Sequence, residues 1–168
     1  MSRPVYTDDF LRLLDQLAPR SLLVLDSTGT ELFTPYLQSH PECQLDHVTD
    51  HDIMSQLQTR GRYALCFAAN TLEHMDKSAA GQVLARLRDV HAERLFVVAP
   101  IGETWRDLVS HWEMTDFIGY GMRLVSSYQQ DGKPLQMYKF DISDYKHTPD
   151  WLSPKNWANP ERWDKGRW

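Results

Sequence analysis

The chain has 168 residues, of which 42% are apolar and 24% charged, and its formal net charge is −5. This size and composition predict one soluble globular domain with a hydrophobic core of its own. The acidic balance argues against a nucleic-acid binder, which usually carries a basic face. No apolar run reaches the roughly 18 residues that a membrane span needs. Two cysteines are too few for a disulfide framework, so we expect a cytoplasmic protein.

Helical and extended patterns alternate in the first part of the chain. A helix is expected to begin at Thr7, whose hydroxyl can cap free backbone N–H groups, and to end at Pro19. The patterns after it predict a strand at Leu22–Asp26, a tight turn at Ser27–Gly29 and a helix at Glu31–Ser39. A second strand at Cys43–Thr49 and a short helix at Asp52–Thr59 follow.

The central segment, residues 63–100, reads as two buried strands joined by a helix. An apolar run from Tyr63 is followed by the polar stretch Asn70–His74, and a second apolar run, Leu95–Ala99, ends at Pro100. Between them, Asp76 is expected to cap a helix with one apolar face. Two buried parallel strands with a crossover helix give this order, so the polar stretch should lie at the carboxyl edge of a sheet, where such sheets bind ligands.

The C-terminal third predicts a helix, a hairpin and a tail. Trp105, Leu108, Val109 and Trp112 have helical spacing. Met122–Tyr128 and Leu135–Ile142 flank an Asp-Gly turn and predict a hairpin, with Leu124, Ser126 and Tyr128 on one of its faces. Residues 146–168 are rich in proline and tryptophan. This tail either docks onto another protein or a second subunit, or it folds back over the chain's own apolar surface.

The order of elements predicts a three-layer α/β/α sandwich over residues 1–145, with a mostly parallel sheet and a C-terminal antiparallel hairpin. Two segments carry a resemblance to the class I S-adenosylmethionine-dependent methyltransferase family over Ser21–Ile142. LLVLDSTG resembles the family's first motif, an apolar strand followed by an acid and a glycine-rich turn. NTLEHM, with the helix after it and RLFVVAP, resembles the family's fourth-strand motif and its next strand.

The resemblance implies a cofactor site formed by Asp26, Thr28, Gly29, Asp50 and Asn70. Asp26 and the turn after it would lie beneath S-adenosylmethionine, Asp50 would accept hydrogen bonds from both ribose hydroxyls, and Asn70 would meet the amino-acid portion. His74 would act as a general base on a substrate. The residues alone leave other roles open: Asp26 as the cap of the helix near Thr30, Asn70 and Glu73 as residues that satisfy the loop backbone, and His74 as a half-buried side chain without a chemical role.

This sequence also departs from the family pattern. The turn keeps one glycine, Gly29, where the family usually has three. Twelve residues separate Asp50 from Tyr63, too few for the family's third strand and its helix. We therefore predict a methyltransferase-like domain that is degenerate in cofactor binding and serves a binding or regulatory role; the alternative is an active methyltransferase acting on a small molecule. The expected partners are a small molecule, or a protein bound through the tail, and no metal site is predicted.

Overall fold

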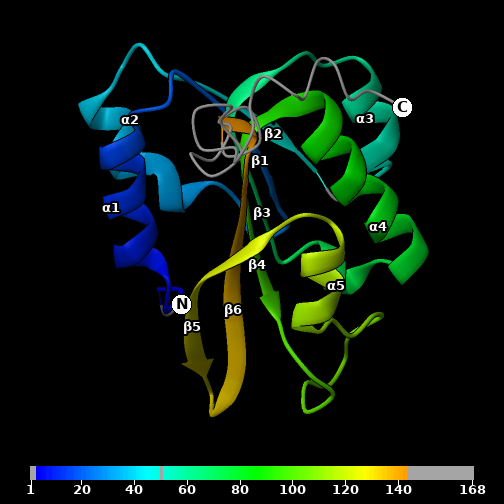
Figure 1. Ribbon diagram of the computed structural model, residues 1–168. Coiled ribbons are helices and arrows are strands. Elements are labelled where there is room, and N and C mark those ends of the chain that lie inside the picture. The colour runs from blue at the N-terminus through cyan, green and yellow to red at the C-terminus, as the bar shows by residue number, and fades with distance from the viewer. Residues whose placement is uncertain (1–2, 50, 144–168) are drawn as a thin grey trace, which may run out of the picture.

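Figure 1 shows one sheet with helices on both of its faces, and the computed structural model describes residues 3–49 and 51–143. The strands are β1 (Ser21–Asp26), β2 (Gln44–Val48), β3 (Tyr63–Ala69), β4 (Ala92–Pro100), β5 (Arg123–Gln130) and β6 (Lys133–Asp141). The helices are α1 (Thr7–Leu17), α2 (Thr34–Ser39), α3 (Ile53–Gln58), α4 (Lys77–Arg86) and α5 (Met114–Gly119). Three shorter helical turns are η1 (Glu31–Phe33), η2 (Leu72–His74) and η3 (Leu87–His91).

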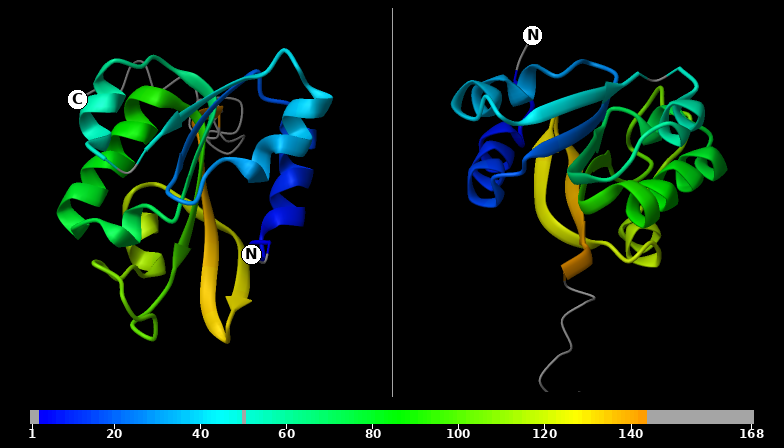
Figure 2. Two further views of the ribbon diagram at one scale, coloured as in Figure 1. Left: turned by 180° about the vertical axis from the view of Figure 1, so that it is seen from behind. Right: turned by 90° about the horizontal axis from the view of Figure 1, so that it is seen from above.

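The sheet has six strands in the order β2-β1-β3-β4-β6-β5. The pairs β1–β2, β1–β3 and β3–β4 are parallel, while β4–β6 and β5–β6 are antiparallel. Figure 2 shows α1 and α2 on one face of the sheet and α3, α4 and α5 on the other. The predicted three-layer sandwich with a C-terminal hairpin is confirmed.

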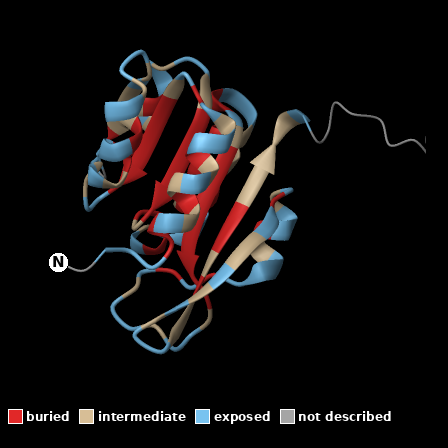
Figure 3. Ribbon diagram, turned by 90° about the vertical axis from the view of Figure 1, so that its left-hand side faces the viewer, coloured by how far each residue is buried: buried red, intermediate tan, exposed pale blue. Residues whose placement is uncertain are grey.

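Two apolar clusters, one on each face, explain why the central strands are apolar throughout. The buried strands stand out in Figure 3, with exposed residues on the outer surfaces of the helices. On the α1 face, the fully buried ring of Phe10 lies 4.5 Å from Phe67 and 5.7 Å from Phe33, between ring centroids. On the other face, α4 packs Val83 and Leu84 against the sheet. Apolar burial on both sides is what keeps a parallel sheet together.

The helix between β3 and β4 begins as predicted. The Asp76 carboxylate accepts hydrogen bonds from the backbone N–H groups of Ser78 and Ala79, at 3.1 and 3.4 Å. These are two of the free donors at a helix start, and a carboxylate also suits the positive end of the helix dipole.

The start of α1 differs from the prediction that Thr7 caps it. The N-cap residue is Tyr6, and no side chain caps this helix. The hydroxyl of Thr7 donates instead to the carbonyl of Pro4, at 2.7 Å. Thr7 thus holds the chain before the helix in place rather than satisfying the helix N–H groups.

The predicted helix through Trp105 and Trp112 is wrong, because residues 102–113 form a loop without helix and α5 begins after it. The backbone N–H groups of Val109 and Ser110 both donate to the carbonyl of Glu73, at 2.9 and 3.1 Å. Asp107 also has a left-handed backbone, with φ of 63°. Hydrogen bonds to another element have replaced the helical ones that the spacing of apolar residues suggested.

The hairpin is confirmed, but its two faces are not those predicted. Asp131 and Gly132 both have positive φ, 54° and 76°, as a two-residue hairpin turn requires. A bulge between Leu124 and Ser126 shifts the register of β5 against β6. Because side chains alternate along a strand, the extra residue puts Leu124 on the face opposite to Ser126.

The sheet ends at β2 in the part of the chain that the structure describes, so the expected absence of a third strand beyond β2 is confirmed there. No helix among the described residues is long and apolar enough to cross a membrane. The predicted tail, residues 146–168, lies outside the described residues, and its role stays a prediction.

Candidate functional site

The two motifs that suggested a ligand site lie side by side at the carboxyl edge of β1 and β3. Asp26 at the end of β1 pairs with Ala69 at the end of β3. The Ser27 hydroxyl donates to the carbonyl of Asn70 at 2.7 Å, and the Asn70 amide donates to the Asp26 carboxylate at 3.2 Å. Two stretches 44 residues apart in sequence therefore form one corner. In Figure 1 this edge of the sheet is the lower one, toward which β4 points.

Asp26 holds the turn after β1 in its conformation. Asp26 is only 6% exposed, and its carboxylate oxygen Oδ1 accepts three hydrogen bonds. The donors are the Thr28 N–H at 2.9 Å, the Thr28 hydroxyl at 2.7 Å, and the Asn70 amide. The alternative role as a helix cap is wrong, because η1 begins after Thr30 with no side-chain cap. Its role beneath a ligand stays a prediction.

Gly29 lies at the tightest point of this turn. Its φ is 117°, a backbone conformation that favours glycine. A Cβ built there would come within 2.6 Å of the Glu31 carboxylate oxygen Oε2. The Glu31 side chain is thus packed against the open face of Gly29. This acid was not among the predicted site residues, and its position could not be read from the turn sequence.

A cavity of about 970 Å³ opens at this corner. Its size is near the upper end of small-molecule sites in proteins. Of the predicted residues, those that border it are Asp26, Thr28, Gly29, Asn70 and His74. Asp50, the sixth predicted residue, lies outside the described residues, so its position relative to the cavity is untested.

Three segments that were not predicted complete the cavity. They are the N-terminal residues 3–7, the loop 105–108 and the hairpin end 129–131. Trp105 ties the loop to the hairpin, because its indole N–H donates to the carbonyl of Pro134 at 2.8 Å and Lys133 lies 5.4 Å from its ring. No local sequence signal points to these walls, since they come from three segments far apart in the chain.

A buried polar group forms the floor of the cavity. Glu73 is 4% exposed, and its carboxylate accepts a hydrogen bond from the Thr71 N–H at 3.1 Å. Burial raises the pKa of Glu73 above its ordinary value, in spite of this hydrogen bond. Burial also raises the pKa of the Tyr6 phenol, and the nearby charges of Asp26 and Glu73 add to that increase. The two acids and the phenol are therefore electrostatically coupled beneath the cavity.

His74 is exposed and borders the mouth of the cavity. Its backbone N–H donates to the carbonyl of Thr71 at 3.1 Å, which closes the turn η2. This position lets its imidazole reach a molecule in the cavity, but its catalytic role stays a prediction. Among residues 3–49 and 51–143, no group of three or more His, Cys, Asp or Glu side chains is arranged to hold a metal ion.

Comparisons with solved structures agree with this fold. The methyltransferase domain of bacterial CtHen1 is similar with a TM-score of 0.57 and 13% identity, over 80% of this chain and 96% of that one. Magnesium protoporphyrin IX methyltransferase (ChlM) from Synechocystis PCC 6803 with bound SAM gives 0.54 and 11%, over 80% and 78%. The pyocyanin biosynthetic protein PhzM gives 0.56 and 13%, over 80% and 53%. At these identities the likeness shows the fold alone, which is methyltransferase-like.

Sequence comparisons give a narrower result. A family model described as "Family of unknown function (DUF6231)" matches residues 6–168. No curated protein matches the chain.

Proposed function

We propose that this chain, which belongs to the DUF6231 family of unknown function, binds S-adenosylmethionine or a closely related nucleoside in the cavity at the β1–β3 corner. The observation that carries the proposal is the open space of about 970 Å³ at the turn after β1. Five of the six residues predicted for this site border that space. The methyltransferase-like fold supports the same ligand class, because proteins of similar fold include one with bound SAM.

The residues around the cavity fit a positively charged nucleoside. The cavity is bordered by five acids, Asp26, Glu31, Glu73, Asp107 and Asp131, and by two arginines, Arg3 and Arg106. Arg3 is engaged by Asp8 at 2.9 Å. An excess of acids at the cavity favours a cation through its local electrostatic field. The sulfonium of S-adenosylmethionine is such a cation, and when bound it supplies a methyl group that a nucleophile can accept.

Within this cavity, Asp26 would organise the turn, and the backbone at Gly29 would allow close approach of the ligand. Since three donors already hold the Asp26 carboxylate, the turn needs little rearrangement when a ligand arrives. Asn70, expected to contact the ligand's amino-acid portion, would contribute by bracing Asp26 from β3.

A role in binding or regulation without catalysis is favoured by two features of the site. The carboxylate of Glu31 lies against Gly29, where the family's turn leaves backbone open to the ligand. The sheet also ends at β2 in the described part of the chain, so no neighbouring strand supplies an acid for the adenine. Both features weaken the cofactor site without closing the cavity.

Catalysis is the second candidate, and it is favoured by His74 at the mouth of the cavity. A neutral imidazole there would take the proton from a substrate hydroxyl or acid as its oxygen receives the methyl group. The acceptor would be a small molecule, since a cavity of about 970 Å³ bordered by the loop 105–108 and the hairpin end has the size of a small-molecule site.

Calorimetric titration with S-adenosylhomocysteine tests binding. We expect saturation at micromolar ligand, lost in Gly29→Arg and kept in Gly61→Arg, a control at a glycine with open space around it that does not border the cavity. Because Gly29→Arg is strained and can fail to fold, the melting temperature of the wild type is measured as well. Ligand at about 100 times its Kd should stabilise the fold by about 2.7 kcal/mol. No heat and no thermal shift at millimolar ligand would overturn the proposal.

Catalysis is tested separately with S-adenosylmethionine that carries a labelled methyl group and a mixture of small-molecule acceptors. Label transfer that is lost in His74→Ala, while S-adenosylhomocysteine still binds, would support the enzyme. Binding without any transfer would support the binding or regulatory role.

A further inference from the structure

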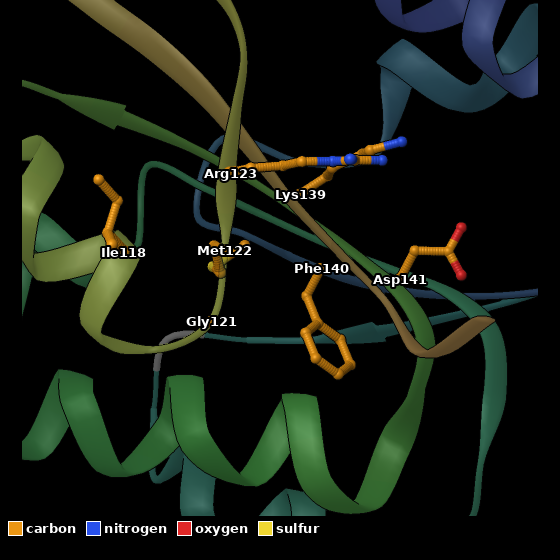
Figure 4. Close-up of a pocket in the computed structure, with 7 residues that line it drawn as sticks. All are labelled: Ile118, Gly121, Met122, Arg123, Lys139, Phe140 and Asp141. Atoms are coloured by element: carbon orange, nitrogen blue, oxygen red, sulfur yellow. The ribbon is translucent and has the colours of Figure 1, made fainter. Parts of the chain in front are cut away.

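A second, smaller hollow lies at the edge of the sheet opposite the candidate site. Its volume is about 320 Å³, and it is formed by the connection from α5 to β5 and by the end of β6. Figure 4 shows the side chains around it, with Phe140 and Asp141 from β6, Arg123 from the start of β5 and Met122 just before it. We call it the α5–β6 pocket. None of the residues assigned to the candidate site lines this pocket.

The floor and one wall of the α5–β6 pocket are apolar. Met122 is 3% exposed, and the half-buried ring of Phe140 packs against the core beneath it. Ile118, on the wall, is 57% exposed, and Met114, one helical turn earlier on α5, is 38% exposed. Large apolar side chains at this exposure mark a surface that gains free energy when an apolar group covers it.

Two cations border the pocket from the face of the sheet that α1 covers, because Lys139 pairs with Phe96 while Phe140 pairs with Leu95. Arg123 and Lys139 are directly opposite each other on β5 and β6, and in Figure 4 their side chains point the same way. On the α5 face, the apolar floor of Met122 and Phe140 suits an indole ring, which buries a large apolar area.

We propose that the α5–β6 pocket receives a tryptophan side chain from the chain's own C-terminal segment, residues 144–168. This segment contains Trp151, Trp157, Trp163 and Trp168. The described chain ends at Ser143, two residues after Asp141, which borders the pocket. Nine residues lie between Asp141 and Trp151, and the ten steps from one to the other can span up to about 33 Å, so even the first tryptophan reaches the pocket.

The chain's own segment is favoured over a separate partner for two reasons. The family model continues to residue 168, so the segment belongs to the same matched unit as the domain. A tethered segment also acts at an effective concentration of about millimolar. A single indole contact is then enough to occupy the pocket, whereas a free partner would need a larger interface.

The test uses the full chain labelled with 5-fluorotryptophan and observed by ¹⁹F NMR. The six tryptophans give six signals, which are assigned by Trp→Phe replacement one at a time. We expect one signal from residues 144–168 to be displaced from the position of a water-exposed indole. Ile118→Asp should return it to that position. Val109→Asp, at an apolar residue 64% exposed in the loop at the other edge of the sheet, should leave it unchanged.

The signal of Trp112, which is 1% exposed, reports in every variant that the core is folded. The proposal is overturned if all four C-terminal signals stay at the exposed position and do not respond to Ile118→Asp. It is equally overturned if the displaced signal moves back on dilution, because the occupant is then the segment of a second copy.

Discussion

Replacement of Asp26 by alanine tests whether this carboxylate holds the ligand-site corner together. The substitution removes the acceptor of three hydrogen bonds, from the N–H and hydroxyl of Thr28 and from the amide of Asn70. A hydrogen bond to a charged group contributes about 1.5–3 kcal/mol, but the three bonds share one oxygen and are not additive.

The expected loss in the free energy of unfolding depends on how well water replaces the Asp26 carboxylate as a hydrogen-bond acceptor. Thr28 is exposed and Asn70 is half-buried, so water in the cavity can accept some of the hydrogen bonds that these donors gave to the carboxylate. We expect the free energy of unfolding to fall by about 2–3 kcal/mol. For a chain of this size, the melting temperature should fall by about 4–12 °C.

Urea denaturation followed by circular dichroism measures the loss. Asp15→Ala, at an exposed acid on α1, is the matched control for removing one carboxylate. Asp26→Asn, which keeps an oxygen acceptor, should lose only about 1 kcal/mol. If Asp26→Ala lies within about 0.5 kcal/mol of Asp15→Ala, Asp26 does not hold the corner and the reasoning is refuted.

Three further outcomes test other features. Gly81→Ala should lower the melting temperature although alanine favours helix, because its Cβ would lie 2.2 Å from the Tyr120 hydroxyl; Tyr120→Phe in the same chain should restore most of the loss. Ala18→Gly should raise the free energy of unfolding in urea by about 0.5–1 kcal/mol, because Ala18 ends α1 with φ of 47°. Glu73→Gln should be more stabilising at pH 7 than at pH 4 in thermal melts, since burial raises the pKa of Glu73. The ionised form of Glu73 is disfavoured in the folded chain, so the wild type loses stability as the pH rises above about 4.3. Parallel plots of melting temperature against pH for the two proteins would contradict this.

Several local features were predictable because short-range chemistry determines them. Asp76 begins α4 because its carboxylate reaches the N–H groups two and three residues later. Asp131 and Gly132 form the hairpin turn because both tolerate positive φ. The buried strands β1, β3 and β4 were evident from apolar runs that lack polar alternation.

The loop 102–113 and the bulge in β5 were not predictable in the same way. Apolar spacing at Trp105 and Trp112 is compatible with a helix, but the carbonyl of Glu73 competes for the same backbone N–H groups. The bulge at Leu124 and Ser126 depends on how β5 meets β6 and α5. In both cases a distant element decided between local conformations of similar energy.

The order of apolar runs, turns and caps by itself determined the layers of this protein, the parallel centre of its sheet and the meeting of Asp26 with Asn70. Parallel strands joined by crossovers put their carboxyl ends at one edge, and that rule needs no coordinates. Only the tertiary structure decided what surrounds that corner: the Glu31 carboxylate against Gly29, the buried Glu73 beneath the cavity, and Trp105 in its wall. These groups come from segments distant in sequence, and their burial and charge depend on long-range packing.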